Sequence, residues 1–202
     1  MTTEEQPSAI PGVAWGRIVR HADVRGSFRE LWRARSFDDL DPRQTGLPAG
    51  APVRFVQSNL SESTTGVLRG LHFHRHQLDY WIVASGRAFV ALVDVRPVIE
   101  GRGAPVVDAR EVEADTTVAI PTGVAHGFLA VEPLQLVYFV TNEYDGADEL
   151  GFAWDDVEAA VPWPFVPGTP DGRPILSGRD STNPSLRELA SRVRELEGRS
   201  SG

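Results

Sequence analysis

Two histidines and an arginine stand close together in the stretch 66–96 (GVLRGLHFHRHQLDYWIVASGRAFVALVDVR). His72 and His74 are two residues apart, and in a β-strand such residues point to the same face. Arg69 lies just upstream of them. Imidazole exchanges protons near neutral pH, and guanidinium makes bidentate contacts to phosphate or carboxylate. We therefore expect this strand to form one wall of a reactive pocket.

Three more polar side chains stand in patterns that suit a site. Gln57 and Asn59 are two residues apart in a predicted strand, 53–60 (VRFVQSNL). Buried amides must find hydrogen-bond partners, so a bound ligand is one explanation and an exposed polar strand face is the other. His126 lies in 121–128 (PTGVAHGF), where the proline and the glycines predict a turn that presents this one histidine.

Short strands separated by turn residues must position these groups. No helical period interrupts residues 53–142, which favours an antiparallel barrel over a fold of alternating strands and helices. The stretch 36–52 predicts a short helix at most, followed by a loop. Ser185 predicts the start of a C-terminal helix, with Glu188 completing a capping box. Its apolar stripe is Leu186, Leu189, Val193 and Leu196.

Composition bounds the class of protein. The 202 residues are 41% hydrophobic, which is enough for one good core, so we predict a single domain over 13–184. We expect residues 1–12 to form a loose N-terminal segment and residues 185–202 to form the C-terminal helix and tail. The net charge of −8 argues against a nucleic-acid surface. Without cysteine there is no disulfide or thiolate chemistry. Nothing resembles a signal peptide or membrane span, which predicts a cytoplasmic protein with no membrane partner.

A series of motifs, taken in order, resembles the dTDP-4-dehydrorhamnose 3,5-epimerase family. These enzymes are cupin-type (jelly-roll) barrels that act on nucleotide-linked 4-keto-6-deoxy sugars. The resemblance implies an all-β fold, an antiparallel cupin-type barrel with a short C-terminal helix. It also implies epimerisation at C3, C5 or both by acid–base catalysis, without a cofactor. The motifs are 23–28, 57–59, 69–72, 121–128, Tyr138, Tyr144, 154–156 and 176–180.

The resemblance assigns roles to residues. It implies that His72 is the base, Asp180 its orienting carboxylate and Tyr138 the acid on the opposite sugar face. From the residues alone, Asp180 also fits a turn and Tyr138 a core aromatic. The family also implies a homodimer formed by strand exchange, in which Arg25 completes the partner's site. The implied substrate-binding residues are Arg25, Phe28, Gln57, Asn59, Arg69, His126, Tyr144 and Arg179.

At two positions the sequence departs from that family. Members typically have glutamine where this chain has His74, and a lysine that stabilises the enolate where it has Asp79. A carboxylate there opposes negative charge growing on the sugar O4. The same substitutions resemble the metal-binding cupin signature. The alternative is therefore a metal-dependent enzyme or binding barrel that holds one divalent ion such as Fe, Mn, Ni or Zn through His72, His74, Asp79 and His126.

Overall fold

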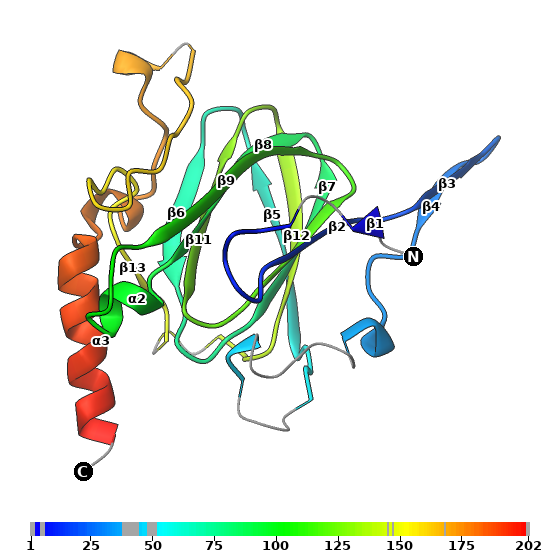
Figure 1. The fold of residues 1–202 in the computed structure, drawn as a ribbon. Helices are drawn as coiled ribbons and strands as arrows, with labels where there is room; N and C mark the ends of the chain where they lie inside the picture. The colour runs from blue at the N-terminus through cyan, green and yellow to red at the C-terminus, as the bar shows by residue number, and fades with distance from the viewer. Residues whose placement is uncertain are drawn as a thin grey trace.

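Two antiparallel β-sheets face each other and form a barrel (Figure 1). The structure, a computed structural model, describes residues 3–4, 7–37, 45–47, 52–144, 146, 148–167 and 169–200. One sheet has the strand order β1 (Thr3–Glu4), β2 (Ala14–Arg17), β10 (Thr116–Ile120), β7 (Asp79–Ser85), β12 (Leu134–Val140) and β5 (Gln57–Ser63). The other has the order β13 (Leu150–Gly151), β6 (Leu68–Phe73), β11 (Val124–Ala130), β8 (Arg87–Asp94) and β9 (Val106–Glu113). The predicted all-β antiparallel barrel is confirmed.

The central strands are buried on both faces, which explains their nearly continuous apolar sequence. In β8, Val90 and Leu92 point between the sheets, whereas Ala91 and Val93 point to the outer face of the five-stranded sheet. In β7, Trp81 points into the barrel and Tyr80 lies on the opposite, outer face. Each sheet therefore needs cover on its outer side as well as its inner side.

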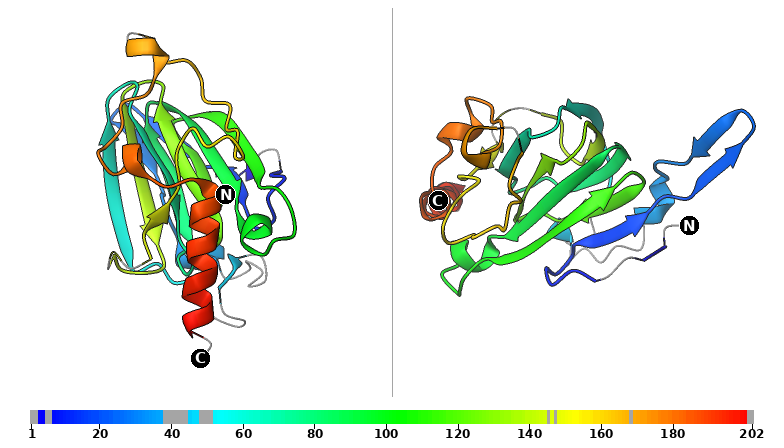
Figure 2. Two further views of the ribbon diagram at one scale, coloured as in Figure 1. Left: turned by 90° about the vertical axis from the view of Figure 1, so that its left-hand side faces the viewer. Right: turned by 90° about the horizontal axis from the view of Figure 1, so that it is seen from above.

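A C-terminal helix covers the outer face of the five-stranded sheet (Figures 1 and 2). This helix, α3 (Leu186–Ser200), buries Leu186, Leu189 and Val193 against that sheet. The predicted capping box is confirmed, because the Ser185 backbone N–H donates to Glu188 Oε2 at 2.8 Å and the Glu188 N–H donates to Ser185 Oγ at 3.3 Å. A single-turn helix, α2 (Arg96–Ile99), packs beside α3.

A β-hairpin projects from the barrel on the side opposite α3 (Figures 1 and 2). Its strands are β3 (Arg20–Asp23) and β4 (Gly26–Arg29), which pair with each other and, among the described residues, with no other strand. Asp115 fixes the base of the hairpin by accepting hydrogen bonds from Arg20 Nε at 2.9 Å and Arg29 Nη1 at 2.5 Å. The sequence predicts one strand over 13–20, and then a turn and a second strand within 21–30. The structure instead ends β2 at Arg17 and devotes 20–29 to the hairpin.

Within 1–12, the segment expected to be loose, β1 pairs with β2 and Ile10 is buried in the core. A 3₁₀ helix, η1 (Ala34–Phe37), occupies the start of 36–52, while 38–44 and 48–51 lie outside the described residues. The arm 154–184 contains η2 (Pro170–Gly172) and η3 (Asp180–Thr182). Among the described residues, no helix is long and apolar enough to cross a membrane.

Candidate active site

A cavity of about 440 Å³ opens between the two sheets. Strands β5, β6, β7, β11 and β12 form its walls, and loop residues after β12 and in the C-terminal arm complete its lining: Asn142, Tyr144, Glu149, Ser177, Arg179 and Asp180. It gathers most of the residues that the sequence singled out. Those lining it are Gln57, Asn59, Arg69, His72, His74, Asp79, His126, Tyr138, Tyr144, Arg179 and Asp180.

His72 and Asp180 form a hydrogen-bonded pair in this cavity. His72 Nε2 lies 2.9 Å from Asp180 Oδ1, and Asp180 is only 4% exposed. A carboxylate only accepts, so it holds the imidazole with a proton on Nε2 and leaves Nδ1 with the lone pair. Burial opposes the charge on Asp180, but hydrogen bonds from His72, Ser177 and the Gly70 backbone keep its pKa below the ordinary value. This arrangement suits a general base.

Long-range contacts bring the two members of the pair together. Ile175 makes an isolated parallel bridge to Val67, which lays the arm alongside β6 and delivers Asp180 to His72. Across β6, His126 of β11 stands opposite His72, beside a β-bulge. At that bulge a Cβ on Gly127 would lie 2.8 Å from the Arg69 carbonyl oxygen, so only glycine fits. The close approach of β6 and β11 sets the spacing of these imidazoles.

His126 does not lie in a turn, contrary to the sequence prediction. The turn covers only 121–123, and β11 begins at Val124, so His126 is a strand residue, 4% exposed. Its Nε2 faces Asp79 Oδ2 at 3.8 Å, an ion pair only if the imidazole is protonated. Burial, outweighing the attraction of Asp79, lowers the pKa of His126 to about 4. At neutral pH we therefore treat this contact as one between a neutral imidazole and a carboxyl group.

Asp79 lies at the start of β7 and is 3% exposed. Gln77 Nε2 donates to its Oδ1 at 2.8 Å, and Trp81 Nε1 donates to its Oδ2 at 3.1 Å. His74 also faces this corner, and its Nδ1 lies 2.9 Å from the Asp148 carbonyl oxygen. Among the described residues, the group that could hold a metal is His74, Asp79 and His126. The four-residue set of the alternative prediction is assembled only in part, because His72 pairs with Asp180 instead.

Tyr138 is partly buried on β12 and directs its phenol into the cavity lining. Burial raises the pKa of Tyr138, and the nearby Asp79 raises it further. A phenol with a raised pKa keeps its proton at neutral pH and gives it up only to a strong base. Tyr138 can therefore serve as a proton donor rather than a nucleophile.

The remaining polar residues that line the cavity, Gln57, Asn59 and Arg69, are suited to binding a polar ligand. Gln57 Nε2 donates to Asn59 Oδ1 at 3.0 Å, and Gln57 Oε1 accepts from the Tyr144 backbone N–H at 2.9 Å. Arg69 donates hydrogen bonds to Ser63 Oγ and to the Glu62 carbonyl oxygen. A guanidinium has five N–H donors, so these two contacts use only some of them. The strand-face prediction for Gln57 and Asn59 is confirmed, and both amides face the cavity.

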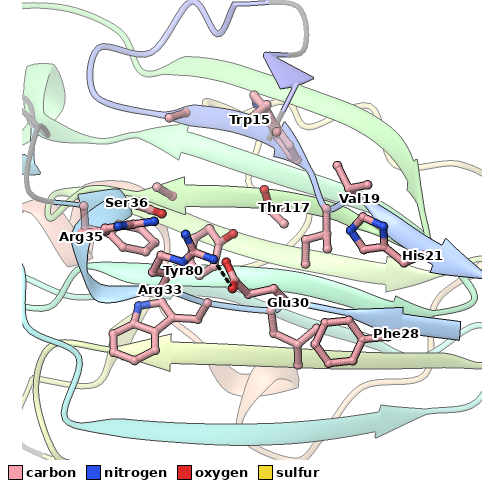
Figure 3. Close-up of a pocket in the computed structure, with 17 residues that line it drawn as sticks. Trp15, Val19, His21, Phe28, Glu30, Arg33, Arg35, Ser36, Tyr80 and Thr117 are labelled. Atoms are coloured by element: carbon pink, nitrogen blue, oxygen red, sulfur yellow. Dashed lines mark hydrogen bonds and ion pairs between the residues drawn. The ribbon is translucent and has the colours of Figure 1, made fainter. Parts of the chain in front are cut away.

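Arg25 and Phe28 are not brought to this cavity within one chain. They lie on the projecting hairpin, where Arg25 pairs with Asp23 and Phe28 is 70% exposed. Phe28 instead lines a second cavity of about 470 Å³, at the base of the hairpin, together with His21 and residues of η1 (Figure 3). This second cavity is slightly larger and contains an ion pair between Glu30 and Arg33, but among the described residues that line it no imidazole is hydrogen-bonded to a carboxylate. We therefore assign the chemistry to the cavity that contains His72.

Sequence reasoning missed several residues of the site. Gln77 and Trp81 lie two residues before and two residues after Asp79. Side chains two apart in a strand point to the same face, so assigning Asp79 to the site would also have indicated Gln77 and Trp81. Glu149 forms an ion pair with Arg179, and hydrogen bonds from Arg179 and Tyr144 outweigh burial and lower the pKa of Glu149. No local pattern signals Glu149, because it reaches the site through a loop.

The fold is a cupin-type barrel, and its cavity is lined by histidines, carboxylates and two arginines. A family model for dTDP-4-dehydrorhamnose 3,5-epimerase matches residues 7–188, so the chain belongs to that family and is a sugar-nucleotide epimerase. The Escherichia coli (strain K12) enzyme of that name is 34% identical over 171 residues, 83% of this chain and 85% of the relative.

Solved structures agree with this assignment. The Mycobacterium tuberculosis rmlC epimerase is similar with a TM-score of 0.77 and 30% identity, covering 96% of each chain. ChmJ, a 3'-monoepimerase from Streptomyces bikiniensis solved in complex with dTDP-quinovose, is similar with a TM-score of 0.73 and 26% identity over 98% of each chain. These relatives include both a 3,5-epimerase and a 3'-monoepimerase, so family membership leaves the reacting carbon open.

Proposed function

We propose that the protein epimerises a dTDP-linked 4-keto-6-deoxyhexose at C3, C5 or both. The observation that carries this proposal is the His72–Asp180 pair at 2.9 Å in a cavity that Tyr138 also lines. The relatives' names support the substrate class, since one is a dTDP-4-dehydrorhamnose 3,5-epimerase and another binds dTDP-quinovose.

The proton transfers follow from the hydrogen bonds. His72 Nδ1 takes the proton from the carbon next to the ketone, and Asp180 stabilises the imidazolium that forms. The electron pair left behind moves onto the ketone oxygen as an enolate. Tyr138 returns a proton to the carbon from the other face, which inverts the centre. Solvent then takes the proton from His72 and restores that of Tyr138, so each inverted carbon gains one solvent-derived proton.

Substrate binding divides along the cavity. We assign the diphosphate and sugar to Arg69 and His126, and the nucleotide to Gln57 and Asn59, with Tyr144 stacking near the base. Arg179 also lines the cavity, and we assign it to the binding of the negatively charged substrate. Arg69, Gln57 and Asn59 supply donors to the cavity, whereas His126, whose Nδ1–H is held by the Val124 carbonyl oxygen, offers Nε2 as an acceptor for a sugar hydroxyl.

We further propose that the protein is a homodimer whose hairpin reaches the partner's cavity. In one chain Arg25 and Phe28 are exposed on β3–β4, the hairpin that projects from the barrel (Figure 2), and neither lines the cavity that the family resemblance assigns them to. The outer face of the six-stranded sheet also carries apolar residues, with Phe55 and Phe139 only partly buried. A second copy placed there would cover that face and receive the hairpin.

Deuterium exchange tests the proposed chemistry. The protein is incubated with a dTDP-4-keto-6-deoxyhexose in deuterated water, and label at C3 and C5 is followed by NMR. We expect label at C3, C5 or both, and a loss of at least about 100-fold in His72→Ala, the contribution of a general base. Undiminished exchange in folded His72→Ala would remove His72 as the base, and no exchange in the wild-type protein would remove the proposed reaction.

A further inference from the structure

His74, Asp79 and His126 converge at one corner of the cavity, where the proposed proton transfers use neither His74 nor Asp79. Each residue offers one ligand atom, and these three atoms all lie within 4.8 Å of one another. Asp79 and His126 are buried and His74 is half-buried. The three come from β7, from β11 and from the turn after β6, so the barrel itself holds them in place.

The hydrogen bonds of both imidazoles leave the same nitrogen available. His74 Nδ1 lies 2.9 Å from the Asp148 carbonyl oxygen, and His126 Nδ1 lies 3.2 Å from the Val124 carbonyl oxygen. Carbonyl oxygens only accept, so each Nδ1 carries the hydrogen and the neutral ring has its lone pair on Nε2. Metal-ligating histidines are oriented in this way by a backbone carbonyl.

The carboxyl group of Asp79 is also held by outer partners. Gln77 donates to Oδ1 and Trp81 to Oδ2, and the Trp81 ring lies edge-on to His126 with centroids 5.1 Å apart. Each carboxylate oxygen keeps a second lone pair. Asp79 Oδ2 faces His126 Nε2 at 3.8 Å, too far for a hydrogen bond and wide enough for a small cation between them.

We propose that His74 Nε2, Asp79 and His126 Nε2 bind one divalent transition-metal ion. Two imidazole nitrogens and one carboxylate oxygen suit Zn²⁺, Fe²⁺, Co²⁺, Ni²⁺ or Mn²⁺, and disfavour Ca²⁺ and Mg²⁺, which take oxygen ligands. Ligand atoms that bind an ion at about 2.1 Å lie roughly 3.0–3.5 Å from one another. The three ligand atoms lie within 4.8 Å of one another without an ion, so binding would bring them roughly 1 Å closer together. The ion keeps open positions toward the cavity.

His72 lies outside this ligand set. Its Nε2 is engaged by Asp180, and its other nitrogen is the one that the proposed reaction uses. The metal site therefore stands beside the acid–base pair without occupying it. The inference concerns binding of an ion to the chain and does not depend on the proposed function, because it is measured without any sugar.

Metal titration tests the site directly. The full chain, produced without a histidine tag, is treated with chelator, desalted, and titrated with Zn²⁺ by calorimetry and with Co²⁺ by visible absorption. We expect one equivalent with a Kd of about 1 μM or tighter, and Co²⁺ bands typical of nitrogen and oxygen ligands. Asp79→Asn and His74→Ala should each weaken Zn²⁺ binding by about 100-fold or more, whereas Gln77→Leu, which removes an outer partner, should weaken it by about 10-fold.

A matched control separates this site from adventitious binding by histidine. His76→Ala removes an exposed imidazole two residues beyond His74, outside the cavity, and should leave stoichiometry and affinity unchanged. His72→Ala should also retain the ion. Circular dichroism checks that each variant is folded. Because the His74 side chain is half-exposed, His74→Ala should disturb the fold less than Asp79→Asn and serves as the test if Asp79→Asn is unstable. Less than about 0.1 equivalent bound by the wild-type chain, or unchanged affinity in folded His74→Ala, would overturn the proposal.

Discussion

Replacing Asp180 with asparagine tests the central pair of the proposed mechanism. The substitution keeps the size of the side chain and removes its negative charge, 2.9 Å from the His72 ring. When His72 takes the substrate proton it becomes a cation, and the charge on Asp180 stabilises that cation. The variant therefore loses an interaction that exists mainly after proton transfer, so it lowers kcat more than it raises KM.

The structure sets the expected size of that loss. Two unit charges about 4 Å apart at an effective dielectric of about 20 attract by about 4 kcal/mol. The His72 side chain is 25% exposed, so we reduce this to about 3 kcal/mol. Each 1.36 kcal/mol is about 10-fold in rate, which gives a decrease of between about 10²- and 10³-fold in deuterium exchange.

The assay compares Asp180→Asn with a matched surface variant. Asp155→Asn removes a half-exposed carboxylate that pairs with Arg173, and should leave exchange unchanged. NMR follows deuterium at C3 and C5 of the sugar, and thermal unfolding checks each fold. If folded Asp180→Asn exchanges within about 10-fold of the wild type, the charge of Asp180 is not part of the mechanism.

Asp180 also links stability to pH. Its folded pKa lies below the ordinary 3.8, so the carboxylate's contribution to stability is fully present above about pH 4. That contribution is lost as the pH falls through the lower, folded pKa. The difference in unfolding free energy between the wild type and Asp180→Asn should therefore shrink in acid, and a difference that grows there would contradict the assignment.

Three further outcomes follow from the structure. Burial and the nearby Asp79 raise the pKa of Tyr138 above the ordinary 10.0. The difference in ultraviolet absorbance between the wild type and Tyr138→Phe should therefore show ionisation of the Tyr138 phenol only above about pH 10. Ionisation of this phenol below about pH 10 would contradict the role of Tyr138 as the acid. Gly127→Ala places a Cβ against backbone of β6 and should cost about 1–3 kcal/mol in thermal unfolding, whereas Gly103→Ala, with no atom nearer than 4.0 Å, should cost less than about 0.5 kcal/mol. Light scattering should give about twice the 22.1 kDa chain mass, and a mass of one chain at micromolar concentration would exclude the proposed dimer.

The sequence predicts the parts of the site that follow local periodicity or short motifs. Gln57 and Asn59 share a face because a strand has a period of two, and this holds without any knowledge of the tertiary fold. The capping box at Ser185 and Glu188 is also a local signal. The pairing of Asp180 with His72 spans more than a hundred residues, and only the family resemblance suggested it.

What the sequence could not predict depends on burial and on long-range pairing. The pattern around Gly123 and Gly127 predicts a turn at His126, whereas Gly127 lies where the backbones of β6 and β11 come close together. Strand β11 is buried on both faces, so it lacks the alternation that would have revealed it. The sequence predicts one strand over 13–20 and a turn with one further strand over 21–30, so it does not reveal that 20–29 form a separate hairpin. Nothing local distinguishes a strand that leaves the sheet from one that joins it.

The projecting hairpin has a consequence for how alleles of this gene would combine. If Arg25 and Phe28 serve the neighbour's cavity, a lesion in the hairpin inactivates the partner's site, while a lesion at His72 inactivates the chain's own. A mixed dimer of the two mutants then contains one cavity with both defects and one with neither. Two inactive alleles would restore function together in one cell, whereas two alleles both defective in the His72–Asp180 pair would not.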